Sequence, residues 1–262
     1  MNVLTDLDGQ LVIAHRGNSA HAPENTLESF AQAVALGVDA LELDVHVTRD
    51  GVPVVIHDPT LGRTTNRPEA VAEISAARLR CADAGANFSG DGGATFPYRG
   101  LGLTIPTLPE VLREFPGVPL LIEVKVAEAA QPIARALARA GATSSCVAAA
   151  MNAPAVAPLR GSDLATGASA GDVLRLLGDV IFRRRPAALP YSALCIPRFY
   201  SGVPLPVAAL ARLARGARAA THVWTVDDVA IAQRLWSDGI QGVVTNDPAP
   251  MLRARSALAT AR

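Results

Sequence analysis

Short apolar segments alternate with segments of helical periodicity along most of this chain, and this alternation restricts the fold more than any other feature. Eight apolar runs are typical of buried strands, and each is followed by a helix or a hairpin. The runs lie near residues 11–14, 41–45, 120–125, 146–150, 163–168, 193–197, 222–226 and 242–246. Successive strand–helix–strand units imply a parallel sheet.

A ninth apolar run, at 52–57, follows the second strand too closely to be another parallel strand, because a parallel crossover needs about a dozen residues. Asp50-Gly51 suits a two-residue type I′ turn, so 52–57 is expected to be the return strand of a hairpin. The remaining eight runs predict an α/β fold, a (β/α)8 TIM barrel. The chain of 262 residues fits one such domain, 1–262, because these barrels run to roughly 250 residues.

Residues 59 to about 105 interrupt the alternation and are rich in Gly, Arg, Thr and Pro. A loop of this length is uncommon in a compact domain unless it is functional. We therefore expect an inserted segment after the second strand's hairpin, lying over the mouth of the site. Regular helices resume afterwards, near residues 107–112, 129–140, 171–182, 206–217, 228–238 and 248–258, and the first helix is expected at 27–36.

Two carboxylates alternate with apolar residues on the second predicted strand. Glu42 and Asp44 share a face, because alternate side chains of a strand point the same way. Glu123 ends the strand at 120–125, and the carboxyl ends of barrel strands meet at one mouth. Buried carboxylates need a neutralising partner, and oxygen ligands favour Mg²⁺ or Ca²⁺ over zinc. The sequence predicts a site for one divalent cation; alternatively, Glu123 only pairs with Lys125.

A histidine is expected beside these carboxylates. With a two-residue turn, Arg49 pairs with Val52, and His57 then lies directly across from Asp44 on the same face. The alternative is an ordinary amphipathic hairpin with a polar face toward solvent.

Two cations and a second histidine complete the predicted site. His15 and Arg16 follow the first strand, and Lys125 follows Glu123 closely. Cations beside a metal site indicate an anionic ligand, and a phosphate fits. His15 and His57 suit a general acid and a general base, because imidazoles titrate near neutral pH. Because polar residues from the ends of separate strands converge on one mouth, the sequence predicts an enzyme. It does not decide which of the two histidines is the acid.

Composition excludes several other classes. The 24 basic and 24 acidic residues cancel, so no overall charge favours nucleic acid or an anionic membrane surface. Three widely spaced cysteines form no metal motif and no disulfide framework. The N-terminus lacks a signal pattern, and no apolar run reaches the roughly 18 to 20 residues of a membrane span. We expect a cytoplasmic protein with no transmembrane segment; its oligomeric state is not predicted.

The candidate residues occur in motifs that resemble those of the glycerophosphodiester phosphodiesterases. The resemblance runs from about residue 11 to 252, in the order of that family. Its motifs are His15-Arg16-Gly17, Glu24-Asn25-Thr26, Glu42-Leu43-Asp44, His57-Asp58, Arg63-Thr64-Thr65, Glu123-Val124-Lys125 and Trp224-Thr225-Val226.

The resemblance implies metal-dependent hydrolysis of glycerophosphodiesters to sn-glycerol 3-phosphate and an alcohol, within glycerol and lipid metabolism. It implies metal ligands at Glu42, Asp44 and Glu123, an acid–base pair at His15 and His57, phosphate ligands at Arg16 and Lys125, and a pocket wall at Trp224. Trp224 is alternatively a core aromatic residue. In this superfamily the nucleophile can be the glycerol 2-hydroxyl of the substrate, which gives a cyclic phosphate that water opens.

Two segments depart from the family pattern. The last strand ends in Thr245-Asn246-Asp247, where the family often has Asp directly after Thr. The stretch 179–192, with Arg183-Arg184-Arg185, matches no motif and is expected to be a surface loop.

Other functions remain open. A lysophospholipase D-like enzyme would be favoured by an exposed apolar rim in 85–103. A non-catalytic barrel that only binds phosphate is disfavoured, because binding alone needs no acid–base pair. A metal-dependent barrel aldolase is also possible, but no motif of this sequence supports it.

Overall fold

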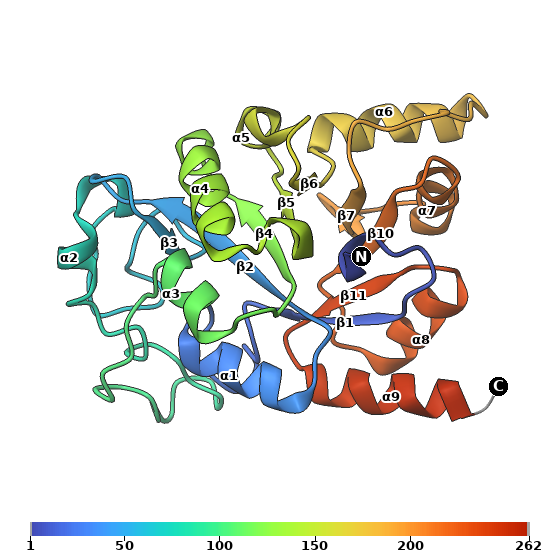
Figure 1. The fold of residues 1–262 in the computed structure, drawn as a ribbon. Helices are drawn as coiled ribbons and strands as arrows, with labels where there is room; N and C mark the ends of the chain where they lie inside the picture. Colours follow the sequence, from blue (N-terminus) through green and yellow to red (C-terminus); the bar gives the residue numbers. More distant parts are fainter. Residues whose placement is uncertain (1, 261–262) are drawn as a thin grey trace.

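Eight parallel strands form a nearly closed barrel at the centre of the molecule (Figure 1). The computed structural model describes residues 2–260. The barrel strands are β1 (Leu11–His15), β2 (Ala40–Val47), β4 (Leu120–Val124), β5 (Cys146–Ala149), β6 (Ala165–Thr166), β7 (Ala193–Pro197), β10 (Ala220–Trp224) and β11 (Gly242–Thr245). Their order is β6-β5-β4-β2-β1-β11-β10-β7, and a parallel bridge between Gly167 and Ala193 links the two edges. The predicted α/β fold, a TIM barrel, is confirmed.

Helices surround the barrel, as Figure 1 shows. They are α1 (Leu27–Leu36), α3 (Leu108–Glu114), α4 (Ala130–Ala140), α5 (Ala153–Val156), α6 (Ala170–Ile181), α7 (Val207–Gly216), α8 (Val229–Ser237) and α9 (Pro248–Thr260). Thr107 and Glu110 form a reciprocal capping box at the start of α3. Gly37 ends α1 in the left-handed conformation, with φ of 84°. Within residues 2–260, no helix has both the length and the apolar sequence needed to cross a membrane.

The barrel strands alternate between an inner and an outer apolar layer. On β1, fully buried Ile13 packs inside the barrel with Leu121 and Val244. Its neighbour Val12 points outward and packs with Trp236 of α8 and Met251 of α9. This alternation leaves inward-facing positions near the strand ends free to carry polar side chains.

The N-terminal end of the barrel is covered by the short 3-10 helix η1 (Val3–Thr5). Leu4 is fully buried and belongs to the inner apolar cluster. Asn2 Nδ2 donates to the carbonyl of Cys146, the first residue of β5, and His222 Nε2 lies 2.8 Å from the carbonyl oxygen of Leu4. Because this end is filled, the cavity of the barrel opens at the carboxyl ends of the strands.

The hairpin after β2 differs from the prediction by one residue. β3 (Pro53–Val55) does return antiparallel to β2, but Val45 pairs with Val55 and Val47 with Pro53. The loop holds three residues, because Thr48 N donates to Val52 O and Gly51 adopts a φ of 78°. The two-residue turn and its register were therefore wrong.

The segment 59–105 lies to one side of the barrel, around α2 (Ala76–Leu79) in Figure 1. It contains the 3-10 helix η2 (Val71–Glu73) and few other regular elements. Leu61, Val71 and Leu79 form an apolar cluster with Val54 and Ile56 of the hairpin return. The segment is thus packed on the return segment, and none of its residues is among those that line the cavity of the barrel.

The remaining short elements lie in loops between the barrel strands and helices. They are the 3-10 helices η3 (Ala127–Ala129), η4 (Thr143–Ser145) and η5 (Ala157–Leu159), and a small hairpin of β8 (Phe199–Tyr200) and β9 (Val203–Pro204) after β7. The hairpin exposes Phe199, Tyr200 and Val203.

Candidate active site

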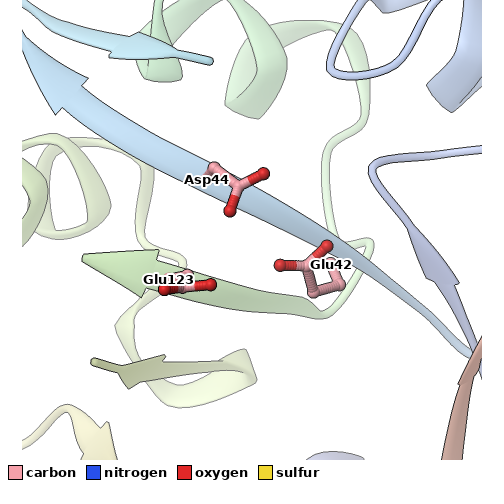
Figure 2. A group of neighbouring side chains, drawn as sticks. All are labelled: Glu42, Asp44 and Glu123. Carbon is pink, nitrogen blue, oxygen red and sulfur yellow. The ribbon is translucent and has the colours of Figure 1, made fainter. Parts of the chain in front are cut away.

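Three carboxylates lie close together inside the barrel, toward the carboxyl ends of β2 and β4. Glu42 and Asp44 are two residues apart on β2, and Asp44 is paired in register with Glu123 on β4 (Figure 2). One ligand oxygen from each residue lies within 4.8 Å of the others. Asp44 is fully buried and Glu42 is 7% exposed. The strand alternation therefore brings together the acidic cluster that was expected from the sequence.

The neighbouring cations neutralise the negative charge of the cluster only in part. Burial raises the pKa of Glu42 well above its ordinary value, and the charges of Asp44 and Glu123 raise it further. Burial also acts to raise the pKa of Asp44, but Lys125 and Arg16 outweigh it, so the pKa of Asp44 lies below its ordinary value. The Glu42 carboxylate thus lacks the compensation that Asp44 has.

Lys125 bridges two of the carboxylates. Its Nζ lies 2.9 Å from Asp44 Oδ1 and 3.0 Å from Glu123 Oε1. The sequence left open whether Glu123 joins the acidic cluster or only pairs with Lys125. In the structure it does both. Desolvation lowers the pKa of Lys125, but Asp44 and Glu123 raise it by more, so the pKa lies above its ordinary value and the side chain is a cation at neutral pH.

Arg16 contacts the same cluster from the loop after β1. Its Nε lies 3.1 Å from Asp44 Oδ2, and its backbone N–H donates to Glu42 Oε2 at 3.0 Å. The backbone of Arg16 has a φ of 56°, a conformation that side-chain-bearing residues rarely adopt. Asn25, with a φ of 58°, donates from Nδ2 to Asp44 Oδ2 at 2.9 Å. These contacts hold Arg16 over the acidic cluster.

His15 lies at the end of β1, directly beside Glu42 of β2. Its Nε2 is 3.9 Å from Glu42 Oε2, and its Nδ1 is 2.7 Å from Asn246 Oδ1. Asn246 is held in turn by Asp227, which accepts from its backbone N–H and from its Nδ2, both at 2.7 Å. Burial and the charge of Arg16 lower the pKa of His15. Neither Asn246 nor Asp227 was assigned to the site from sequence.

His57 lies beyond the end of β3 and lines the same cavity. The observed register places Ile56 across from Asp44, because Ile56 N donates to Asp44 O; the predicted pairing of His57 with Asp44 was therefore wrong. Strand pairing had assumed a regular hairpin, whereas the three-residue loop shifts every pair by one. His57 reaches the cavity from the loop instead, with its backbone carbonyl 3.1 Å from Nε2 of His46.

A chain of charged groups surrounds His57. Its Nδ1 lies 2.6 Å from Asp58 Oδ1, and Arg63 contacts Asp58 with Nε at 2.7 Å. Arg63 also holds both oxygens of Glu24 at 2.7 Å, and Glu24 Oε1 accepts from Arg16 Nη1 at 2.9 Å. Arg63 comes from the inserted segment, so this segment is coupled to both sides of the site. From the sequence, Arg63 was noted only as part of a motif.

The candidate residues border one cavity of about 350 Å³. Its lining includes His15, Arg16, Glu42, His57, Glu123, Lys125 and Trp224, together with Met151, Cys195 and several small apolar residues. Trp224 also packs against the inner apolar cluster, and its contact with a substrate stays a prediction. Asp44 lies behind the lining, in contact with Arg16 and Lys125.

The donor set suits a hard divalent cation. The ligand atoms of the cluster are carboxylate oxygens, the type that Mg²⁺ and Ca²⁺ prefer. Cys195 lies nearby, but burial, followed by the charges of Glu42 and Glu123, raises its pKa to about 12. The thiol therefore stays protonated and is a poor ligand for a soft metal.

Comparison with known proteins identifies the family. The model of the glycerophosphoryl diester phosphodiesterase family matches residues 15–250. The chain belongs to this family. The predicted resemblance is thereby confirmed, and with it the membership of a family of phosphoric diester hydrolases.

Curated relatives carry the same family name. A glycerophosphodiester phosphodiesterase of Caldanaerobacter subterraneus is 42% identical over 116 residues, which is 44% of this chain and 44% of the relative. A probable glycerophosphodiester phosphodiesterase 2 of Mycobacterium tuberculosis is 28% identical over 254 residues, covering 94% of this chain and 90% of the relative. The first match thus spans less than half the length of its relative, whereas the second spans nearly all of it.

Solved structures of the family have the same fold. The phosphodiesterase domain of a Mycobacterium tuberculosis protein superposes with a TM-score of 0.81 at 23% identity, covering 95% of this chain and 100% of that domain. An Oleispira antarctica phosphodiesterase, solved with its product sn-glycerol-3-phosphate, gives a TM-score of 0.76 at 26% identity, with 94% and 96% covered. These structures support the barrel architecture independently of the strand pattern.

Proposed function

We propose that this chain hydrolyses glycerophosphodiesters, small-molecule substrates, to sn-glycerol 3-phosphate and an alcohol. The observation that carries the proposal is that three carboxylates, two cations and two imidazoles border or support one cavity. The family and the names of its curated members support the reaction class. The product named for the Oleispira structure supports the identity of the phosphate fragment.

Glu42, Asp44 and Glu123 would hold one divalent cation, Mg²⁺ or Ca²⁺. The raised pKa of Glu42 supports this, because the buried carboxylate lacks a full counter-charge. When bound, such a cation supplies Lewis-acid stabilisation of charge on the phosphodiester and its transition state.

Arg16 and Lys125 would bind the phosphate oxygens. Both side chains line the cavity, and carboxylates hold each of them in place. Fixed positive charges stabilise a transition state without the reorganisation that water would require. Trp224 would contact the glycerol or the departing alcohol, because it lines the same cavity with a broad apolar surface.

His15 would act as the general base. Asp227 accepts only, so the Asn246 amide must direct Nδ2 toward Asp227 and Oδ1 toward His15. His15 Nδ1 then carries the proton, and Nε2 is free to accept one. The lowered pKa of His15 also favours the neutral ring.

His57 would act as the general acid. Its Nδ1 lies 2.6 Å from Asp58 Oδ1, and this contact orients the ring at the edge of the cavity. His15 would take the proton from the attacking hydroxyl, either water or the glycerol 2-hydroxyl, as the new P–O bond forms. His57 would protonate the alcohol oxygen as the old P–O bond breaks. Attack by water gives sn-glycerol 3-phosphate directly. Attack by the glycerol 2-hydroxyl gives a cyclic phosphate, which water would open in a second step as the proton held by His15 returns to the 2-oxygen and His57 takes the proton of the water.

Release of sn-glycerol 3-phosphate from glycerophosphoethanolamine, measured with Mg²⁺ or Ca²⁺ present, tests the activity. We expect turnover by the wild type and a loss of at least about 100-fold in His57→Ala, the size usual for a general acid. The exposed His21, 58% accessible in its side chain, provides a matched control, and His21→Ala is expected to keep the activity. A wild type that does not turn over, or an active His57→Ala variant, would reject the proposal.

A lysophospholipase D-like activity gains no support from the segment 85–103. Among its described residues, the large hydrophobic side chain that is exposed is Leu101, at 66%, whereas Phe88, Phe96 and Tyr98 are half-buried. One exposed side chain is too small for the apolar rim that such a substrate requires. The cytoplasmic location and the division into one domain with an insertion stay predictions.

A further inference from the structure

The outer face of α6 carries exposed apolar side chains. Leu174 is 68% exposed and Ile181 is 66% exposed. They lie seven residues apart, about two helical turns, and so share one face of the helix. Phe182, directly after the helix, is 68% exposed and continues this face. Figure 1 shows α6 on the outside of the barrel, and the exposed fractions of these three side chains mean that the described residues leave them largely uncovered.

Four arginines lie at the C-terminal end of this apolar face. Arg183, Arg184 and Arg185 follow Phe182 directly, and Arg212 of α7 lines the same surface groove of about 620 Å³. All four are exposed. Among the ion pairs of residues 2–260, none involves any of them, although Asp179 also lines the groove. Their positive charge is therefore available to an external ligand.

We propose that this face, Leu174, Ile181 and Phe182 with Arg183, Arg184, Arg185 and Arg212, docks the protein on an anionic lipid surface. A helix with bulky apolar side chains and flanking arginines suits the boundary between headgroups and acyl chains. The apolar side chains enter that boundary, and the guanidinium groups bind lipid phosphates. The balanced charge of the whole chain, 24 basic against 24 acidic residues, gave no indication of such a surface, because the asymmetry is local.

Charge complementarity decides between lipid and a second copy of the chain. A symmetric dimer through this face would bring the same arginines of both copies together, and like charges repel. An anionic bilayer supplies the missing negative charge over the whole face. A purely acidic segment, such as poly-glutamate, could pair with the arginines, but it offers no apolar partner to the three exposed apolar side chains.

The face lies away from the mouth of the cavity. Ala168, just before α6, lines the cavity, so α6 begins at the mouth. Its C-terminal end, with the arginines, leads to the start of β7 at the opposite end of the barrel. Docking by this end leaves the mouth open to solvent.

Flotation of the full chain with vesicles tests the proposal. Phosphatidylcholine vesicles are compared with vesicles that also contain phosphatidylglycerol, at low salt and at about 1 M salt, where charges are screened. We expect at least about tenfold stronger binding to the anionic vesicles at low salt, on the scale of several arginines near a charged surface. Equal binding to both kinds of vesicle, or none to either, would overturn the proposal.

Two variants and a matched control locate the docking face. The triple change Arg183→Gln, Arg184→Gln and Arg185→Gln is expected to weaken anionic binding at least about tenfold, and Ile181→Ser with Phe182→Ser is expected to weaken it similarly. The control removes three exposed arginines of another groove, by Arg113→Gln, Arg135→Gln and Arg139→Gln, and should bind as the wild type. Unchanged binding in the first two variants, or an equal loss in the control, would overturn the assignment.

Two further readouts complete the test. Thermal unfolding checks that each variant folds. If the apolar double variant does not fold, the arginine triple variant alone tests the docking face. Light scattering checks for a concentration-dependent dimer, and a poly-glutamate peptide stands for an acidic partner. A dimer that the face variants abolish, or peptide binding without vesicle binding, would assign the face to that occupant and overturn the proposal.

Discussion

Asn246 Oδ1 lies 2.7 Å from Nδ1 of His15, although the two residues are 231 positions apart in the chain. The amide cannot turn round without losing its contact to Asp227, whose Oδ2 accepts from Asn246 Nδ2 at 2.7 Å. Ser19 Oγ also donates to Asn246 Oδ1, at 3.1 Å. The end of β11 therefore fixes which nitrogen of His15 carries the proton, and which one faces Glu42.

Replacement of this amide is expected to slow the reaction. In Asn246→Ala the buried Nδ1 of His15 loses its partner, so we predict a fall in kcat of about tenfold, equivalent to ~1.4 kcal/mol for a lost hydrogen bond. The same contact raises the pKa of His15, so its loss lowers that pKa further. A base with a lower pKa stays neutral to lower pH, and the acidic limb of the kcat/KM profile should move to lower pH.

The control for this variant is Asn152→Ala, which removes an exposed asparagine without a side-chain capping bond. It should leave both kcat and the pH profile unchanged. If Asn246→Ala keeps the acidic limb of the wild type, His15 is not the base that this limb reports.

Arg63 is expected to act as a positioning residue. It joins Asp58, the partner of His57, to Glu24, the partner of Arg16. Lysine cannot make these paired contacts, so Arg63→Lys should lower kcat/KM by about tenfold. Activity measured against substrate concentration should show both a lower kcat, from His57, and a higher KM, from Arg16.

Arg67 offers the comparison within the same segment. It pairs with Glu69 and contacts no candidate site residue, so Arg67→Lys should keep the wild-type kcat and KM. Equal effects in the two variants would mean that Arg63 only stabilises the inserted segment.

The acidic cluster could be predicted because its cause is local. Alternation along β2 places Glu42 and Asp44 on one face, and parallel neighbours bring Glu123 alongside. The positions of His15, Arg16 and Lys125 at the cavity could be predicted as well, because the strand ends of a barrel share one mouth.

The contacts that orient the histidines could not be predicted in this way. The register of the hairpin depended on one loop residue, so the expected pairing of His57 with Asp44 failed. Asp227, in the loop after β10, contacts Asn246, which directly follows β11. Arg63, in the inserted segment, contacts Glu24, in the loop after β1. Such contacts depend on how loops fold over the mouth, which periodicity does not describe.

His222 is expected to make stability depend on pH. It is fully buried, and burial lowers its pKa from 6.5 to about 4, against an opposing hydrogen bond to Leu4 O. Between these values the unfolded chain binds a proton that the folded chain excludes. The free energy of unfolding should therefore fall as pH drops through this window, by up to about 1.4 kcal/mol per pH unit.

Urea unfolding at several values of pH within that window checks this prediction. His222→Gln keeps a donor for Leu4 O and removes the titrating group, so its stability should depend less steeply on pH than that of the wild type. His21→Ala, which changes an exposed histidine, should retain the wild-type slope. A wild-type slope in His222→Gln would exclude His222 as the source.

Glu42, Asp44 and Glu123 are proposed to hold the divalent cation that the reaction needs. The most direct test titrates chelator-treated protein with Mg²⁺ or Ca²⁺ and follows release of sn-glycerol 3-phosphate, for the wild type, Glu123→Gln and the exposed control Glu114→Gln. We predict no turnover before metal is added, full recovery in the wild type and the control, and an activating concentration at least about tenfold higher in Glu123→Gln. Full turnover after chelation, or identical titrations of the wild type and Glu123→Gln, would contradict the metal site.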